Sequence, residues 1–164
     1  MADNNSMITL IVHKNDNLMK LLVNYDKNLH EPTEFNTLTT DELIKINDTV
    51  IEIYGGKKTE ISTTKKSELD SIIYPQILEY LKDIPNLKKI CIIFINILTF
   101  HKFSDGNKRT AWIAFELMLY KNNLSFYSDI SDGEKFKLLL NIINDNLNFD
   151  EVYAKLKNQI IPTF

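Results

Sequence analysis

Two long apolar runs near the middle of the chain frame a short polar stretch. The first run spans residues 89–100 and the second spans residues 111–120. Each run is apolar nearly all round, and a helix with that pattern lies inside a protein rather than on its surface. The stretch between them, residues 101–110, contains the turn signal Asp105-Gly106. The pattern therefore predicts two buried helices joined by a polar loop.

Amphipathic spacing and capping residues predict further helices on both sides of this pair. Thr39 and Glu42 form a capping box that opens a helix through Ile53, and Gly55-Gly56 ends it. Further helices are predicted to start at Ser67, to span Pro75–Lys82 and to span Glu151–Ile160. Another helix is predicted to start at Ser131, which forms a second capping box with Glu134. Its predicted core stripe consists of Phe136, Leu139, Leu140, Ile143 and Leu147. With so many helices and little strand, we expect an all-α fold.

The start of the chain has a pattern of its own. Met7–Val12 is rich in β-branched residues and predicts a short strand or extended arm, and Asn17–Asn28 has the spacing of an amphipathic helix. We expect residues 1–37 to form an extension that packs on a single domain made by residues 38–164.

Composition narrows the class of protein. The chain has 164 residues, of which 44% are hydrophobic and 25% charged, as is ordinary for one globular domain. A net charge of −3 argues against a general nucleic-acid binder. No signal peptide is evident, and the longest apolar run is shorter than the ~20 residues that cross a membrane. The lone Cys91 cannot form a disulfide within the chain. We therefore expect a cytoplasmic protein that binds neither nucleic acid nor membrane.

The polar loop has the chemistry of a phosphate site. If a helix begins near Asn107, its first backbone N–H groups lack partners inside the helix, and with the helix dipole they attract anions. Gly106 lets a ligand approach the backbone closely. Lys108 and Arg109 add positive charge, and arginine can bind phosphate oxygens in a bidentate way.

Two further side chains extend this chemistry to catalysis. Asp105 is placed to hold a Mg²⁺ ion that bridges phosphates. His101, at the end of the preceding helix, can be neutral at pH 7 and accept a proton. Taken singly, His101 could be a structural histidine, Asp105 a turn residue, and the two cations a solvated first turn. Their combination in one loop favours attack of a hydroxyl on a nucleotide phosphate.

The loop residues also resemble a known signature. The pattern His101-x-Phe103-x-Asp105-Gly106-Asn107-Lys108-Arg109 is similar to the H-x-F-x-[DE]-[GA]-N-[GK]-R motif of the Fic/Doc superfamily, and is closest to its death-on-curing (Doc) branch. The resemblance covers residues 38–126. It implies a compact helical fold with a flap or hairpin beside the loop, formed by Lys57–Lys66; a plain surface loop is the alternative for that segment.

The resemblance also implies a role for each loop residue. His101 would be the general base and Asp105 the Mg²⁺ ligand. Asn107 and Arg109 would contact the phosphates of ATP, and the backbone from Gly106 to Arg109 would form the anion hole. Lys108 stands where Fic enzymes have glycine, and a lysine there is associated with a reversed nucleotide and transfer of the γ-phosphate rather than AMP.

A second departure concerns regulation. Many Fic proteins carry another arginine where this chain has Trp112, and that arginine pairs with an inhibitory glutamate. Thr64 and Glu68 fit part of the inhibitory motif, but Leu69 follows the glutamate and the arginine is absent. These differences argue against internal inhibition through Glu68 and favour control by a separate antitoxin.

Three functions remain open at this point. The leading hypothesis is a Doc-like toxin, a protein kinase that uses ATP and Mg²⁺ to phosphorylate a hydroxyl of its target. By resemblance that target is the bacterial translation elongation factor EF-Tu, so translation would be blocked. The second hypothesis is AMP transfer, which Gly106 favours because the best-known Doc-like loops have alanine there. The third is an inactive nucleotide-binding module with a regulatory role.

Overall fold

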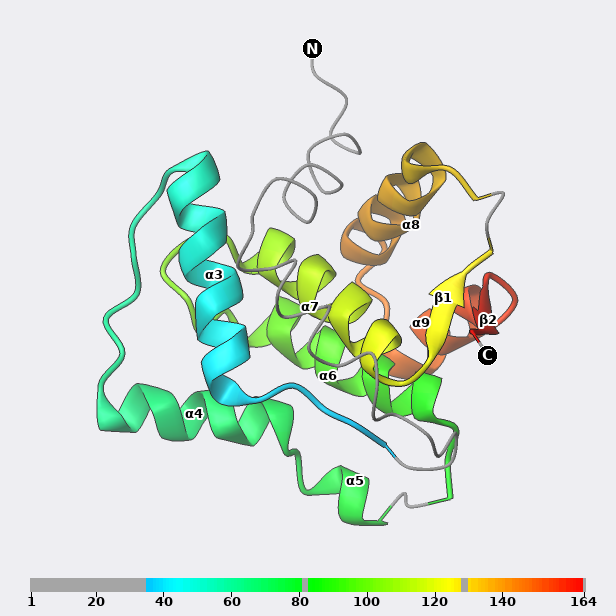
Figure 1. Ribbon diagram of the computed structural model, residues 1–164, viewed down its shortest axis with the longest axis horizontal. Coiled ribbons are helices and arrows are strands. Elements are labelled where there is room, and N and C mark those ends of the chain that lie inside the picture. Colours follow the sequence, from blue (N-terminus) through cyan, green and yellow to red (C-terminus); the bar gives the residue numbers. More distant parts are fainter. Residues whose placement is uncertain (1–34, 81–82, 128–129, 164) are drawn as a thin grey trace.

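The computed structural model of the chain describes residues 35–80, 83–127 and 130–163, and Figure 1 labels its elements. The elements are α3 (Thr40–Tyr54), α4 (Thr63–Ile73), α5 (Ile77–Tyr80), α6 (Asn86–Phe100), α7 (Asn107–Lys121), β1 (Leu124–Phe126), α8 (Asp132–Asn144), α9 (Phe149–Leu156) and β2 (Ile160–Pro162). In the described residues β1 and β2 form an antiparallel two-stranded sheet. The predicted all-α class is confirmed.

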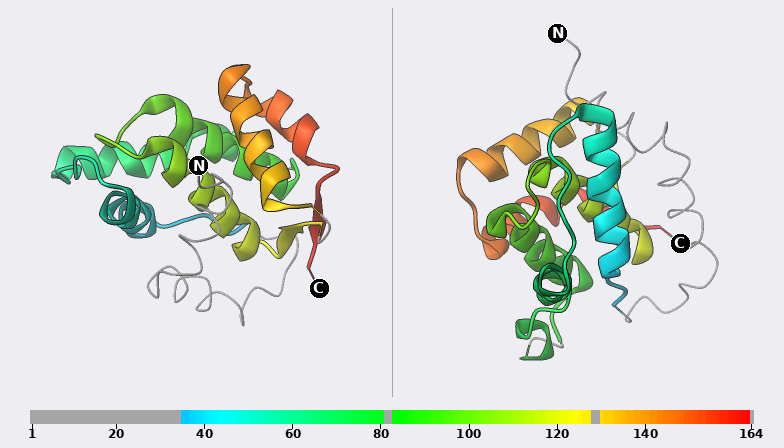
Figure 2. Two further views of the ribbon diagram at one scale, coloured as in Figure 1. Left: turned by 90° about the horizontal axis from the view of Figure 1, so that it is seen from above. Right: turned by 90° about the vertical axis from the view of Figure 1, so that its left-hand side faces the viewer.

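Helices α6 and α7 lie side by side at the centre of the molecule, with α3 and α4 on one side and α8, α9 and the small sheet on the other (Figures 1 and 2). Both central helices are buried over most of their length, as the two apolar runs predict. Aromatic side chains hold the pair together: Phe94 of α6 packs on Phe115 of α7 with ring centroids 5.1 Å apart. Trp112 stacks on Phe115 at 5.5 Å and on Phe126 of β1 at 6.0 Å.

Helix α3 packs against α7 and has the boundaries that its sequence predicts. Thr39 accepts a hydrogen bond from the Glu42 N–H, Glu42 accepts one from the Thr39 N–H, and Gly55 ends the helix at φ 83°. Glu42 also forms a buried ion pair with Lys121 of α7 at 2.8 Å. Burial lowers the pKa of the Lys121 ammonium, and Glu42 opposes that shift. The capping box therefore also ties the start of α3 to the end of α7.

Several helix boundaries differ from the prediction. Helix α4 begins at Thr63 rather than Ser67, because the Ser62 side chain caps it by accepting from the Lys65 N–H. The last helix starts at Phe149, where Asn148 and Glu151 form a capping box, and stops at Leu156. Ile160, which continues the helical spacing in the sequence, instead pairs with Phe126 in the sheet.

The stripe predicted for α8 is confirmed at Leu139, which is buried, and at Phe136, Ile143 and Leu147, which pack against the core. Leu140 is the exception, since it is 40% exposed and Ile142 is buried in the core. Residues 57–62 contain no strand; they run past the polar loop into α4, and the small sheet lies on the other side of the molecule (Figure 1).

Some predictions fall where the structure gives no description. The predicted strand Met7–Val12 and the predicted helix Asn17–Asn28 lie outside the described residues, as does the end of the helix predicted for Pro75–Lys82. No helix in the described part of the chain has both the length and the apolar character needed to cross a membrane.

Candidate functional site

The polar loop brings its chemistry together between the end of α6 and the start of α7. His101 is the C-cap of α6 and holds a left-handed backbone conformation, with φ 48° and ψ 49°. Histidine is one of the few side chains enriched in that region. The conformation ends α6 and turns the chain into the loop, where the imidazole is exposed. His101 is therefore accessible to a substrate, as a general base must be.

Gly106 is the N-cap of α7 and also has a left-handed backbone, with φ 76°. A Cβ added there would lie 2.9 Å from Val50 Cγ1 of α3, so a side chain has no room. No side chain caps this end of α7. The first backbone N–H groups of the helix, from Asn107 to Arg109, consequently face the loop with the positive end of the helix dipole, as an anion site requires.

Asp105 lies beside this helix start with an exposed carboxylate. Its Oδ2 accepts a hydrogen bond from the Lys57 N–H at 2.6 Å, and its backbone carbonyl accepts one from Asn47 Nδ2 at 2.9 Å. The other carboxylate oxygen, Oδ1, can serve as a metal ligand. Mg²⁺ commonly takes one or two carboxylates and completes its shell with phosphate oxygens and water. Asp105 therefore fits a Mg²⁺ that is bound together with a nucleotide.

No group of three or more His, Cys, Asp or Glu side chains that could hold a metal occurs among the residues that the structure describes. A metal at Asp105 would take its remaining ligands from the nucleotide and from water.

The side chain of Asn107 is engaged inside the loop. Its Oδ1 accepts from the Phe103 N–H at 3.1 Å, and its Nδ2 donates to the Phe103 carbonyl at 2.9 Å. Phe103 itself is buried. The resemblance implies that Asn107 contacts phosphate; in the structure its amide closes the loop around Phe103, and its backbone N–H lies at the helix start.

Arg109 lies on the exposed side of the first turn of α7, as its predicted role requires. Its guanidinium stacks over the ring of Tyr54, with 4.1 Å between the guanidinium carbon and the ring centroid. Tyr54 is the last residue of α3. Burial raises the pKa of the Tyr54 hydroxyl, and the charge of Arg109 opposes that shift. The stacking orients the planar cation, and the sequence analysis did not find it.

Asn47 is a second residue that the sequence analysis missed. It is 1% exposed, and its Nδ2 donates to the Asp105 carbonyl and, at 3.1 Å, to Thr110 Oγ1. A signal for it exists: Asn47 falls on the same helix face as Leu43, Ile46 and Val50, so it is a polar residue within an apolar stripe. Asn47 thereby joins α3 to both ends of the Asp105–Thr110 segment.

A cavity of about 370 Å³ opens next to His101 and Lys108. Its volume is in the range of pockets that bind small ligands. The wall is mostly apolar and comes from α6, α8 and the segment after α8; the lining residues are Ile95, Leu98, Thr99, His101, Lys108, Ile142, Ile143, Asn146 and Leu147. Lys108 is thus placed between the helix start and this cavity.

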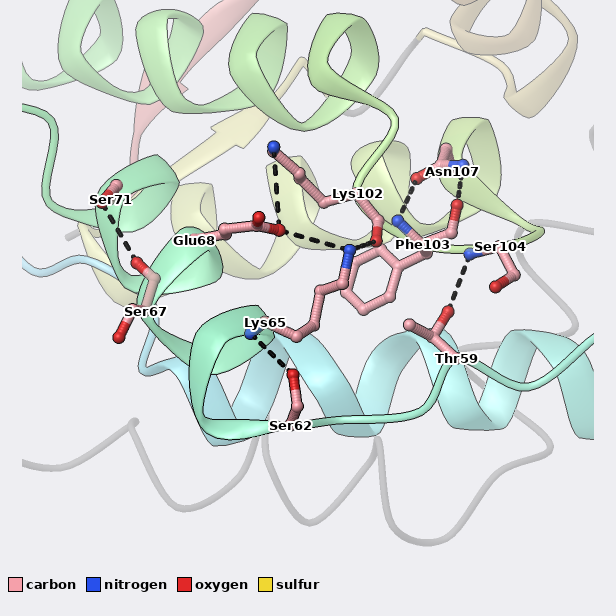
Figure 3. A network of polar contacts seen from close by, with 10 residues as sticks. All are labelled: Thr59, Ser62, Lys65, Ser67, Glu68, Ser71, Lys102, Phe103, Ser104 and Asn107. Carbon is pink, nitrogen blue, oxygen red and sulfur yellow. Dashed lines mark hydrogen bonds and ion pairs between the residues drawn. The ribbon is translucent and has the colours of Figure 1, made fainter.

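Glu68 of α4 lies next to Lys65 of the same helix and Lys102 of the loop. Its Oε2 is 3.3 Å from Lys65 Nζ and 3.7 Å from Lys102 Nζ (Figure 3). The position that would carry a partner arginine is Trp112, which is buried in the aromatic core. The Glu68 carboxylate therefore forms ion pairs with Lys65 and Lys102 beside the loop.

With the loop geometry established, the comparison with protein families assigns the chain. The model of the Fic/DOC family matches residues 37–119, a segment that includes α3, α4, α6 and the whole loop. This chain belongs to the Fic/DOC family. Comparisons with curated proteins and with solved structures found no match. Members of the family are typically transferases that modify proteins, and they typically use ATP with Mg²⁺.

Proposed function

We propose that this Fic/DOC protein is a Doc-like toxin that transfers the γ-phosphate of ATP to a hydroxyl of a target protein. The observation that carries the proposal is the grouping in one loop of an exposed histidine, an exposed carboxylate and an uncapped helix start. Lys108, which replaces the glycine of Fic enzymes, supports γ-phosphate transfer over AMP transfer.

The residues would share the reaction as follows. His101 accepts the proton of the target hydroxyl as its oxygen bonds to the γ-phosphorus, and the bond to the ADP oxygen breaks. The N–H groups at the start of α7, together with Lys108 and Arg109, stabilise the charge on the transferring phosphate. Asp105 would hold the Mg²⁺, which supplies further neutralisation of phosphate charge when it is bound.

The partners follow from the same resemblance. The target would be a translation elongation factor similar to EF-Tu, and modification would block translation. Because Glu68 contacts lysines and Trp112 occupies the position of the partner arginine, inhibition would come from a cognate antitoxin.

AMP transfer is the second candidate, and the cavity favours it. The cavity borders His101. If the adenine of ATP binds between the apolar walls of the cavity, the α-phosphate, rather than the γ-phosphate, would lie nearest the imidazole. For γ-phosphate transfer the adenine must lie farther from His101. Filling the cavity with Ile143→Trp should therefore weaken AMP transfer more than phosphate transfer.

The test is transfer of label from ATP to proteins of a bacterial lysate, run in parallel with γ-labelled and α-labelled nucleotide. His101→Ala should reduce labelling by at least about a hundredfold, with an unchanged melting temperature. A band from the γ label alone supports the kinase, and a band from the α label alone supports AMP transfer. Nucleotide binding with no labelled protein from either nucleotide would contradict both and favour an inactive binding module. Equal labelling by wild type and His101→Ala would refute the mechanism.

A further inference from the structure

The backbone just after His101 is held from α4 by a charged side chain. Lys65 Nζ donates a hydrogen bond to the carbonyl of Lys102 at 2.9 Å, across 37 positions of sequence. Figure 3 shows the Lys65 side chain reaching from α4 to this carbonyl, with the Glu68 carboxylate beside it. The contact lies one residue from the proposed general base.

His101 needs such support because its backbone conformation is uncommon for a residue with a side chain. A non-glycine residue in the left-handed region persists only where its surroundings hold it there. On one side α6 ends at His101, and on the other Asn107 binds both backbone polar groups of Phe103. Lys102 lies between these two anchors, and its carbonyl is bound by Lys65.

Glu68 holds the two lysines in place. Its Oε2 pairs with both ammonium groups, so Lys102 is bound at its carbonyl by Lys65 and at its side chain by Glu68. The side chain of Lys65 is only 26% exposed. Without the carboxylate, the two cations would repel each other, and Lys65 would move away from the carbonyl.

We infer that Lys65, held by Glu68, is a positioning residue that sets the backbone of His101 for proton transfer. The inference rests on the proposed role of His101 as the general base. It gives Glu68 a supporting role in activity, because the carboxylate keeps the lysine on the loop. Removing either side chain should lower the rate of transfer without weakening nucleotide binding.

The test compares Lys65→Met with Lys66→Met. Both changes replace a lysine of the same helix by an unbranched apolar chain, but Lys66 is 53% exposed and pairs with the exposed Asp41. Lys65→Met should lower kcat for protein labelling about ten- to a hundredfold, since small misplacement of a reacting group has effects of that size, with little change in KM for ATP. Lys66→Met should match wild type. Lys65→Arg, which can still donate to the carbonyl, should recover most of the rate.

A spectroscopic measurement tests the inference without relying on activity. Backbone amide NMR signals of residues 101–103 should shift in Lys65→Met and in Glu68→Gln, and should keep their wild-type positions in Lys66→Met. The inference is overturned if Lys65→Met folds and leaves both kcat and these signals as Lys66→Met does. If Lys65→Met does not fold, Glu68→Gln decides by the same two measurements. If the wild-type protein labels no target, the proposed transferase function is refuted. The NMR comparison would still test whether Lys65 positions the backbone of residues 101–103.

Discussion

At the scale of single residues, the loop depends on two left-handed backbone positions with different causes. His101 adopts φ 48° and is held by contacts on both sides of the loop, whereas Gly106 adopts φ 76° with no side chain that could resist it. Gly106 also lies against α3, where an added Cβ would meet Val50 Cγ1 at 2.9 Å. The tight turn between Asp105 and α7 therefore requires glycine in this chain.

Gly106→Ala tests that requirement. We expect it to lower the free energy of unfolding by about 1–3 kcal/mol, because alanine is strained at this φ and its methyl group crowds Val50. Urea unfolding of the variant and of wild type measures the difference. As a control, a Cβ added at Gly55 would meet no atom within 4 Å, so Gly55→Ala has only the backbone strain. Equal stability of Gly106→Ala and wild type would contradict this account of the turn.

The Tyr54 ring orients the guanidinium of Arg109, the residue proposed to bind phosphate. The ring lies 4.1 Å from the guanidinium carbon, so it restricts the cation to one plane. Tyr54→Leu should raise KM for ATP about two- to fivefold, the effect of an exposed cation–π contact, and should leave kcat nearly unchanged. Tyr54→Phe keeps the ring and should behave as wild type in the same kinetic assay. A KM that rises equally in both variants would assign the effect to the hydroxyl instead.

At the scale of elements, α3 is the support on which the loop is built. Its residues Asn47, Val50 and Tyr54 contact, in turn, the Asp105 carbonyl, the turn at Gly106 and the Arg109 side chain. Successive spacings of three and four residues place them along one helix face, so a single helix sets the positions of three parts of the loop. Helix α4 adds its own contacts from Lys65 on the other side.

Asn47→Ala should show how much the loop depends on α3. The change removes two hydrogen bonds and leaves the Asp105 carbonyl and the buried Thr110 hydroxyl without their donor, while it also removes an Oδ1 that has no partner in the described structure. We expect a loss of about 1–2 kcal/mol in the free energy of unfolding, measured in urea, with slower protein labelling because Asp105 moves. Thr110→Val breaks only one of these bonds and should cost less. A larger cost for Thr110→Val would mean that the bond to Asp105 has little effect.

At the scale of the whole molecule, ion pairs join α7 to the elements on both sides. Lys121 meets Glu42 of α3 in a buried pair, and Glu116 lies 3.9 Å from Lys135 of α8 with a side chain that is 27% exposed. Burial raises the pKa of the Glu116 carboxyl above its ordinary value of 4.5, and Lys135 opposes part of that shift. The folded protein therefore holds a proton at Glu116 more tightly than the unfolded chain does.

Glu116→Gln should be stabilised relative to wild type in a pH-dependent way, because the folded protein binds a proton at Glu116 more tightly than the unfolded chain does. The contribution of Glu116 to stability is present at acid pH and is lost as pH rises through its pKa in the folded state. The amide cannot ionise, so the free energy of unfolding of Glu116→Gln relative to wild type should be greater at pH 7 than at pH 4. Urea unfolding at the two pH values measures it, with the exposed Glu52→Gln as a control. The same difference at both pH values would contradict the assignment.

Local sequence signals were sufficient for much of the fold. The capping boxes at Thr39 and Ser131 and the end of α3 at Gly55 were predicted and are observed. Asn148 with Glu151 has the same form and was overlooked. Ser67 shows the limit of such signals, because a serine followed by acidic residues can lie inside a helix that Ser62 has already capped. Ile160 shows another limit, since helical spacing continues into a residue that pairs as a strand.

The sequence by itself determined the two buried helices and the reactive groups of the loop between them. Those features depend on apolar periodicity and on contacts within one helical turn, which neighbouring residues decide. Only the tertiary structure decided which distant residues support that loop. Lys65 reaches Lys102 across 37 positions and Asn47 reaches Asp105 across 58. Such contacts depend on how α3 and α4 pack against α6 and α7, and packing is a property of the assembled core rather than of any local pattern.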